Sequence, residues 1–337
     1  MGRMSDPTAT APGRLLADVG GTNARFAFQS APGAALSEVS VLPVAAYPRL
    51  QDALHDYLGR LGPQRRVQAA AIAIANPVTG DQLHMTNHDW SFSQRALREE
   101  MGWSRLRVVN DFTALAMALP LLPAEHLRQL GGGAALPHAA RALLGAGTGL
   151  GVSGLLPDGR GGWVPIEGEG GHVTLPAATP RERLVMDALA QRHGRASAER
   201  VCSGTGLLET FGILCAADGV ATQGITSAAE VSAAALQHGQ PQALETLQMF
   251  CGLMGSVAGN LALTLGARGG VYLGGGIVPR LGDWFDHSAF RARFEDKGRF
   301  SGYLAAIPVW VITARDSPAL LGAAACLDGL DGGAPMR

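Results

Sequence analysis

Apolar runs along this chain repeatedly end in short stretches of glycine and small polar residues. The first run covers residues 15–17, leads to Asp18 and a turn at residues 20–23, and resumes as alternation over residues 25–28. A second glycine-rich turn separates apolar runs around residue 147. Apolar runs joined by such turns predict β-hairpins. One hairpin in each half of the chain suggests an internal duplication in which each half has its own sheet.

The remaining pattern alternates between strand and helix signals. Helices are predicted by three- and four-residue apolar spacing, and strands by short apolar runs. Between residues 67 and 92 we expect a strand, a turn at 77–81 and a second strand, followed by a helix capped by Ser91 or Ser93. Further helices are expected over 180–194, 227–239 and 241–265. Near the end we expect a strand, three glycines and a helix start over 269–281, a strand over 307–313, and a last helix from about 318 to 327. Strands that alternate with helices indicate an α/β protein.

Composition removes several classes of function. The 337 residues are 47% hydrophobic and 16% charged, so a large core is expected. The net charge is −1, so we expect no nucleic-acid or membrane partner. The chain has a single lysine, Lys297, which lies in neither a Walker A loop nor a protein-kinase context. The four cysteines have no metal-ligand spacing and are expected to be reduced thiols in a cytoplasmic protein.

Glycine-rich turns after strands are candidate phosphate sites, because glycine lets backbone N–H groups converge on an anion. The alternative is that these glycines serve only to form the tight turns of the hairpins. The turn at 145–151 does not match the dinucleotide-binding fingerprint G-x-G-x-x-G, because the third glycine would fall on Leu150. A strand is also predicted after it, where the fingerprint requires a helix. Asp18, beside the first turn, is either a turn residue or a carboxylate that faces phosphate through Mg²⁺, most simply by way of water.

Asn110 and Asp111 stand where a predicted strand gives way to a predicted helix. Either side chain could cap the helix. The alternative is a catalytic carboxylate, because open α/β sheets bind ligands at the carboxyl ends of their strands. The pattern leaves both interpretations open.

A further loop, "EGEGGH" at 167–172, places carboxylates and an imidazole among glycines. Glu167, Glu169 and His172 resemble metal ligands, but no second histidine lies at ligand spacing nearby. They suit the hydroxyls of a sugar equally well, so we expect no metal ligated by the protein itself.

Together these segments resemble a known family. The stretches "DVGGTNARFAF", "NPVTGD", "MTNHDWSFS", "NDFTA", "GAGTGLGV", "EGEGGHV", "SAERVCSGTGL", "GGVYLGGGIVPR" and "FEDKGRF" occur in the order typical of bacterial glucokinases in the hexokinase, Hsp70 and actin superfamily, over residues 14–327. The scattered cysteines do not match the zinc loop of the related repressor-and-kinase group. Thr174 and Thr205 depart from the family pattern, where an acidic residue and a proline are common.

The resemblance implies a two-domain, actin-like (ribonuclease H-like) ATPase fold with a central cleft. The expected division is a disordered tail over 1–13, a smaller α/β domain over 14–121 plus 312–330, and a larger α/β domain over 122–311. It also implies site residues. ATP would be bound by Ala17, Asp18, Val19, Gly20, Gly21, Thr22, Asn23, Gly147, Thr148 and Gly149, with Gly274, Gly275 and Gly276 against the adenosine. Glucose would be bound by Asn110, Asp111, Glu169, His172 and Glu199.

The resulting hypothesis is phosphorylation of D-glucose at its 6-hydroxyl by ATP with Mg²⁺, with Asp111 as the general base. The alternatives are a kinase for another hexose, such as fructose or mannose, and a non-catalytic glucose sensor. A phosphohydrolase of the same superfamily is a weaker fourth possibility. The family also suggests a homodimer.

Overall fold

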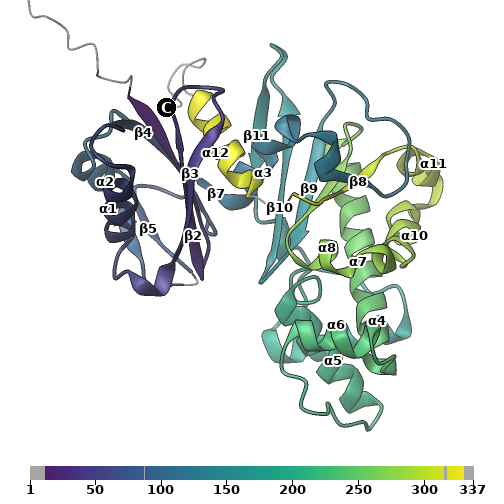
Figure 1. Cartoon of the computed structure of the whole chain (residues 1–337). Coiled ribbons are helices and arrows are strands. Elements are labelled where there is room, and N and C mark those ends of the chain that lie inside the picture. Colours follow the sequence, from purple (N-terminus) through teal and green to yellow (C-terminus); the bar gives the residue numbers. More distant parts are fainter. Residues whose placement is uncertain (1–11, 87, 315–316, 330–337) are drawn as a thin grey trace, which may run out of the picture. The chain divides into compact units, whose positions relative to one another are not determined.

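The computed structural model describes residues 12–86, 88–314 and 317–329 (Figure 1). Of these, the residues up to 122 and from 314 onward form one compact unit, here unit 1, and residues 123–313 form a second, unit 2. The tail expected over residues 1–13 lies outside the described residues, except that Pro12 is described and Gly13 opens the first strand.

Unit 1 is built on a five-stranded sheet in the order β3-β2-β1-β4-β7, in which β1, β4 and β7 are parallel. Its strands are β1 (Gly13–Val19), β2 (Asn23–Gln29), β3 (Leu36–Pro43), β4 (Val67–Ile74) and β7 (Arg105–Asn110), beside a ribbon of β5 (Gln82–His84) and β6 (Ser91–Ser93). Its helices are α1 (Leu50–Leu61), α2 (Gln94–Glu100), α3 (Asp111–Ala118), α12 (Pro318–Asp328) and the 3₁₀ turns η1 (Val44–Ala46) and η2 (Leu119–Leu121).

Alternation along β4 shows why this sheet is covered on both faces. Ile72 and Ile74 pack in one core with residues of α1, whereas Ala71 packs with α12 and Ala73 with α3. The face toward α3 and α12 is made largely of alanine, which lets these helices approach the sheet closely. In Figure 1, α12 lies beside α3 although some two hundred residues separate them in the sequence.

Unit 2 has a six-stranded sheet in the order β11-β10-β9-β12-β13-β8. Its strands are β8 (Leu127–Gln129), β9 (Arg141–Ala146), β10 (Leu150–Pro157), β11 (Trp163–Glu167), β12 (Val271–Gly274) and β13 (Val309–Ile312). Its helices are α4 (Pro180–His193), α5 (Gly204–Ala217), α6 (Ala228–Leu236), α7 (Pro241–Leu265), α8 (Ile277–Leu281), α9 (Asp283–Asp286), α10 (Phe290–Glu295), α11 (Ser301–Ala305) and the 3₁₀ turns η3 (Ala124–His126), η4 (Gly170–His172) and η5 (Gly298–Phe300).

The two sheets repeat one topology. In each, an antiparallel hairpin (β1–β2 or β9–β10) pairs with a third strand on one side and with two parallel strands on the other. The strands β3-β2-β1-β4-β7 therefore correspond to β11-β10-β9-β12-β13. This confirms the predicted duplication, with β8 as an addition to the second copy.

Helix α7 is the central helix of unit 2. Within the described part of the chain it is the one helix long and apolar enough to span a membrane, but 78% of its apolar window is buried inside the protein. It packs against α5, α6 and α10, and buried residues such as Phe250, Leu253 and Met254 join it to the main core. These contacts identify α7 as a core helix.

The hairpins and the predicted helices are confirmed, and the cap of one helix can now be assigned. Of the two candidate caps for α2, Ser93 is the cap, since its hydroxyl accepts from the Ala96 N–H at 3.1 Å, whereas Ser91 lies in β6. Helix α1 and the short helices α9–α11 were not predicted, and neither was α5. Helix α5 opens with Gly-Thr-Gly, which is typical of a turn, and its apolar residues surround the helix instead of forming one stripe.

Candidate active site

In unit 1 the predicted residues gather at the carboxyl edge of the sheet. Val19 is in register with Ile74, and Ile74 with Asn110, so the ends of β1, β4 and β7 lie in a row. The turn that follows β1 and the Asn110–Asp111 pair that follows β7 therefore belong to the same edge. This is the edge where parallel sheets bind ligands.

The turn between β1 and β2 is tight and presents backbone amides. The Gly20 N–H donates to the Asn23 carbonyl at 3.0 Å, and the Val44 N–H donates to the Thr22 carbonyl at 2.9 Å. The amides of Gly21 and Thr22 have no hydrogen-bond partner within the described residues. Two adjacent unpaired N–H groups in a glycine turn are suited to an anion such as phosphate.

Asp18 is held at the end of β1 from two sides. The Ser317 hydroxyl, just before α12, donates to its carboxylate, and the Arg25 guanidinium lies 3.7 Å from the same oxygen. The side chain is 15% exposed, which leaves it accessible to water. Within the described residues no group of three metal-type ligands occurs. One carboxylate beside two unpaired backbone amides would fit Mg²⁺ that keeps most of its water ligands.

Asn110 is the cap of α3. Its Oδ1 accepts from the N–H groups of Phe112 at 2.9 Å and Thr113 at 3.2 Å, and its Nδ2 donates to the Asn76 carbonyl at 3.3 Å. The capping interpretation is therefore right for Asn110. One amide hydrogen of Nδ2 is left for a ligand.

Asp111 is the first residue of α3 and is half-buried. Its Oδ1 accepts from the Phe112 N–H at 2.9 Å, a group that Asn110 already binds. Because Asn110 supplies the cap, the helix does not require a carboxylate at position 111. The structure thus separates the two residues that the sequence left equivalent.

In unit 2 the hairpin turn between β9 and β10 also presents backbone amides, although it closes with a different hydrogen bond. The Gly147 N–H donates to the Gly149 carbonyl at 2.8 Å, and the Gly147 carbonyl accepts from the Gly204 N–H, also at 2.8 Å. The amides of Thr148 and Gly149 have no partner in the part of the chain that the structure describes. This turn therefore offers a second pair of amides to an anion.

The third glycine segment lies directly against this hairpin. Gly274 is in register with Gly145, and a Cβ on Gly145 would lie 2.5 Å from the Gly274 carbonyl carbon. Gly275 has φ +77°, and a Cβ there would lie 2.3 Å from the Ala146 carbonyl oxygen. Only glycine permits this approach, so the structure brings the predicted phosphate and adenosine segments of unit 2 together.

The segments that carry the predicted sugar residues of unit 2 lie next to each other. The loop that carries Glu169 and His172 pairs with the segment that carries Glu199, through a 2.8 Å bond from the Glu199 N–H to the Gly171 carbonyl. Glu169 and His172 are exposed, and Glu199 is half-buried. The Glu199 Oε2 accepts from the Leu150 N–H at 2.9 Å, which ties this carboxylate to the hairpin.

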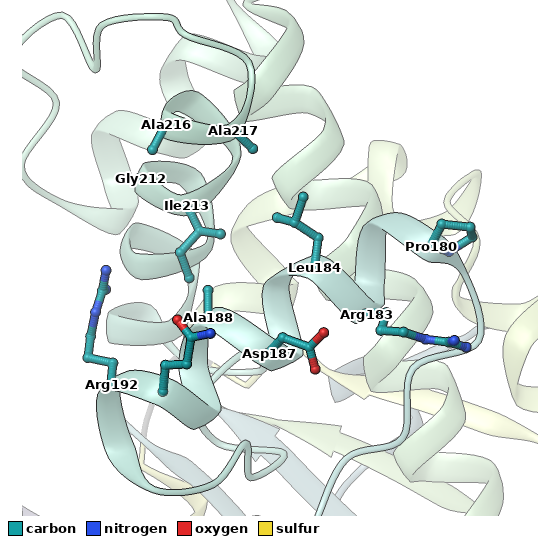
Figure 2. Close-up of a pocket in the computed structure, with 11 residues that line it drawn as sticks. Pro180, Arg183, Leu184, Asp187, Ala188, Arg192, Gly212, Ile213, Ala216 and Ala217 are labelled. Carbon is teal, nitrogen blue, oxygen red and sulfur yellow. The ribbon is translucent and has the colours of Figure 1, made fainter.

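Two hollows of unit 2 bear on the search for a ligand site. The larger, about 730 Å³, lies between α4 and α5 and is lined by residues such as Leu184, Asp187, Arg192 and Ile213 (Figure 2). It contains none of the predicted residues. The smaller, about 260 Å³, is formed by α5, α6 and α8 and includes Ile277, the residue that follows the glycine segment at 274–276.

Sequence reasoning missed three supporting residues. The Asn76 carbonyl accepts a hydrogen bond from the Asn110 side-chain amide, and the Ser317 hydroxyl donates to the Asp18 carboxylate. The Arg195 guanidinium donates to the His172 carbonyl at 2.6 Å. Each acts on a neighbour through a contact between distant parts of the sequence, which spacing does not reveal. Of the two departures from the family pattern, Thr174 forms a bridge with Ser197, and the Thr205 hydroxyl lies 3.1 Å from that of Ser203.

Comparisons with known proteins show the family to which the chain is similar. A family model described as Glucokinase matches residues 15–330. The Glucokinase of Chromobacterium violaceum is 54% identical over 314 residues, which cover 93% of this chain and 89% of that protein. The crystal structure of a glucokinase from an Antarctic psychrotroph is 34% identical, covers 94% of this chain and 99% of that one, and has a TM-score of 0.84.

A more distant structure extends the likeness of the fold. A ROK family glucokinase from Streptomyces griseus, solved with glucose and AMPPNP, is 20% identical, covers 93% of this chain and 98% of that one, and has a TM-score of 0.60. The duplicated α/β topology and these likenesses confirm the predicted actin-like ATPase fold. The family model spans nearly all of the described residues, and more than half of the residues aligned with the bacterial relative are identical; the chain belongs to the glucokinase family.

Proposed function

We propose that this chain transfers the γ-phosphoryl group of ATP to the 6-hydroxyl of D-glucose, with Asp111 as the general base. One observation carries the assignment of the base. Asp111 lies at the carboxyl edge of the unit 1 sheet, on a helix whose cap is supplied by Asn110. A carboxylate at this edge, on a helix that takes its cap from another residue, is suited to accept a proton from a bound hydroxyl.

The transfer makes and breaks one bond to phosphorus. The 6-oxygen of the sugar attacks the γ-phosphorus while its proton passes to the Asp111 carboxylate, and the bond from the γ-phosphorus to the bridging oxygen breaks to release ADP. Phosphoryl transfer depends mainly on positioning and on neutralisation of charge. General base catalysis supplies roughly 10²- to 10⁴-fold of the rate.

Sugar binding is assigned to the remaining predicted residues. Asn110 offers its second amide hydrogen, and Glu169, His172 and Glu199 offer carboxylate and imidazole groups to the other hydroxyls. The paired loops of unit 2 support this assignment, because they place these three side chains on neighbouring segments that are hydrogen-bonded to each other.

ATP binding is assigned to the three glycine segments. The unpaired amides of Gly21, Thr22, Thr148 and Gly149 are proposed as donors to phosphate oxygens. The adenosine is proposed to lie at Gly274–Gly276 and in the adjoining hollow, whose wall of leucine, isoleucine and alanine suits an aromatic base.

Magnesium is proposed to accompany the nucleotide, where it neutralises phosphate charge. Asp18 would hold it through water, since one carboxylate fixed by Ser317 and Arg25 is a suitable outer ligand. We also propose a cytoplasmic homodimer, as the family suggests.

The test is sugar-dependent ADP release from MgATP with glucose, mannose, fructose and no added sugar. Strong turnover with glucose and little without sugar is expected. A greater kcat/KM for fructose or mannose than for glucose would assign that hexose as the substrate instead. ADP release that does not depend on sugar would indicate a phosphohydrolase. Glucose binding by calorimetry without any turnover would contradict the assignment and indicate a sensor.

A further inference from the structure

The carboxylate of Glu199 occupies the space that a side chain at position 149 would need. A Cβ built on Gly149 would lie 2.4 Å from the Glu199 Oε2 and 3.2 Å from its Cδ. No other atoms lie within 4 Å of that position apart from the Glu199 Cγ. The backbone of Gly149 does not have a positive φ, so its conformation would accept alanine. Within the described residues, Glu199 is thus the neighbour that a side chain at position 149 would strike.

Glu199 lies there because the hairpin holds it. The Leu150 N–H donates to Oε2 at 2.9 Å, and this bond to an ionised acceptor is stronger than one between neutral groups. The other carboxylate oxygen, Oε1, has no hydrogen-bond partner within the described residues. One oxygen therefore fixes the group and the other is left for a ligand.

We propose that Gly149 is a positioning residue for sugar binding: the missing side chain lets the hairpin that binds ATP phosphates hold Glu199 in the orientation in which it binds glucose. This rests on the proposed role of Glu199 in sugar binding. The same turn then serves both substrates, since the Gly149 amide is a candidate phosphate donor and the next amide fixes the sugar carboxylate.

Gly147 in the same turn is the matched comparison. A Cβ on Gly147 meets nothing within 4 Å, and its φ is also not positive. Gly147→Ala adds the same methyl group to the same hairpin without contacting Glu199. It is expected to affect the use of ATP, but not the affinity for glucose in the absence of nucleotide.

The experiment measures glucose affinity by calorimetry without nucleotide for the intact chain and four variants: Gly149→Ala, Gly147→Ala, Glu199→Ala, and the double variant Gly149→Ala/Glu199→Ala. Glu199→Ala is expected to weaken binding roughly tenfold or more, as expected for loss of a charged hydrogen bond. Gly149→Ala is expected to do nearly the same, and Gly147→Ala to bind like the unmodified protein. The double variant should match Glu199→Ala, because the added methyl group enters the space the carboxylate has left.

Folding is monitored by thermal unfolding, and amide exchange at Leu150 reports the hydrogen bond directly. The clashing atom is the end of a flexible side chain, so Gly149→Ala should remain folded while the Leu150 amide exchanges faster, as it should in Glu199→Ala. Normal glucose affinity in Gly149→Ala would overturn the inference about Gly149 but not the proposed role of Glu199. The same holds if the double variant binds glucose more weakly than Glu199→Ala. Normal affinity in Glu199→Ala would overturn both the inference and the proposed sugar role of Glu199.

Discussion

Gly322 of α12 lies directly against the backbone of Ala114 in α3. A Cβ on Gly322 would lie 1.6 Å from the Ala114 carbonyl oxygen and 3.0 Å from the Ala118 nitrogen. These are backbone atoms of a helix and cannot turn aside as a side chain can. The two helices that cover one face of the unit 1 sheet are therefore held at a separation that only glycine allows.

Gly322→Ala is expected to destabilise the protein. Overpacking of a buried contact costs roughly 1–3 kcal/mol and sometimes more. Here the strain would push α12 away from α3; α3 begins at Asp111, and α12 follows Ser317, which bonds to Asp18. Urea unfolding measures the loss. Gly59→Ala in α1 is the control, since its Cβ meets nothing within 4 Å and alanine favours a helix by roughly 0.5–1 kcal/mol. Equal stability changes in the two variants would contradict the close approach.

Substitution at Asn110 should separate its two roles. Asn110→Ser keeps an oxygen that can cap α3 but removes the amide hydrogens, so stability should change little while the KM for glucose rises. Asn110→Ala should lose both, with about 1 kcal/mol of stability lost with the cap. Chemical unfolding and steady-state kinetics measure the two effects. A normal glucose KM in Asn110→Ser would limit Asn110 to capping.

Arg195 is expected to act on the sugar loop through its bond to the His172 carbonyl. Arg195→Ala should raise the KM for glucose several-fold with a smaller effect on kcat, since the loop that positions His172 becomes looser. The KM for ATP should stay near its original value, because Arg195 contacts neither glycine turn. An unchanged KM for glucose would show that the loop is held without this contact.

Two buried thiols predict a loss of stability at alkaline pH. Burial raises the pKa of Cys251 to about 12 and raises that of Cys202 as well. Because the folded pKa lies above the unfolded value, each thiol keeps its proton in the folded state while the unfolded chain loses it. Stability should therefore fall as pH rises above about 9 and continue to fall toward 12.

Urea midpoints between pH 8 and pH 10.5 measure this dependence. Cys251→Ala is expected to be less stable at pH 8 because a small cavity forms, but to lose less stability over the pH range than the unmodified chain. Identical slopes for the two proteins would show that this thiol does not titrate differently on folding.

The sequence predicts elements and motifs better than it predicts the contacts between them. Glycine turns after apolar strands identified both hairpins, because strand and turn signals are local. Asn110 and Asp111 stayed ambiguous, since which of two adjacent acceptors caps a helix depends on backbone geometry at the strand end. Gly149 was assigned to phosphate binding, and its second relationship, to Glu199, joins residues fifty positions apart. Such contacts come from the fold and leave no local pattern.

Asp111→Asn tests the central claim most directly, because it keeps the size of the side chain and an oxygen acceptor while removing the base. The measurement is kcat for MgATP and saturating glucose, beside glucose affinity and thermal stability of the same preparation. We predict that kcat falls by roughly 100-fold or more, while the protein remains folded and still binds glucose. Turnover close to that of the unmodified protein would contradict the assignment and leave Asp111 with a structural role at the start of α3.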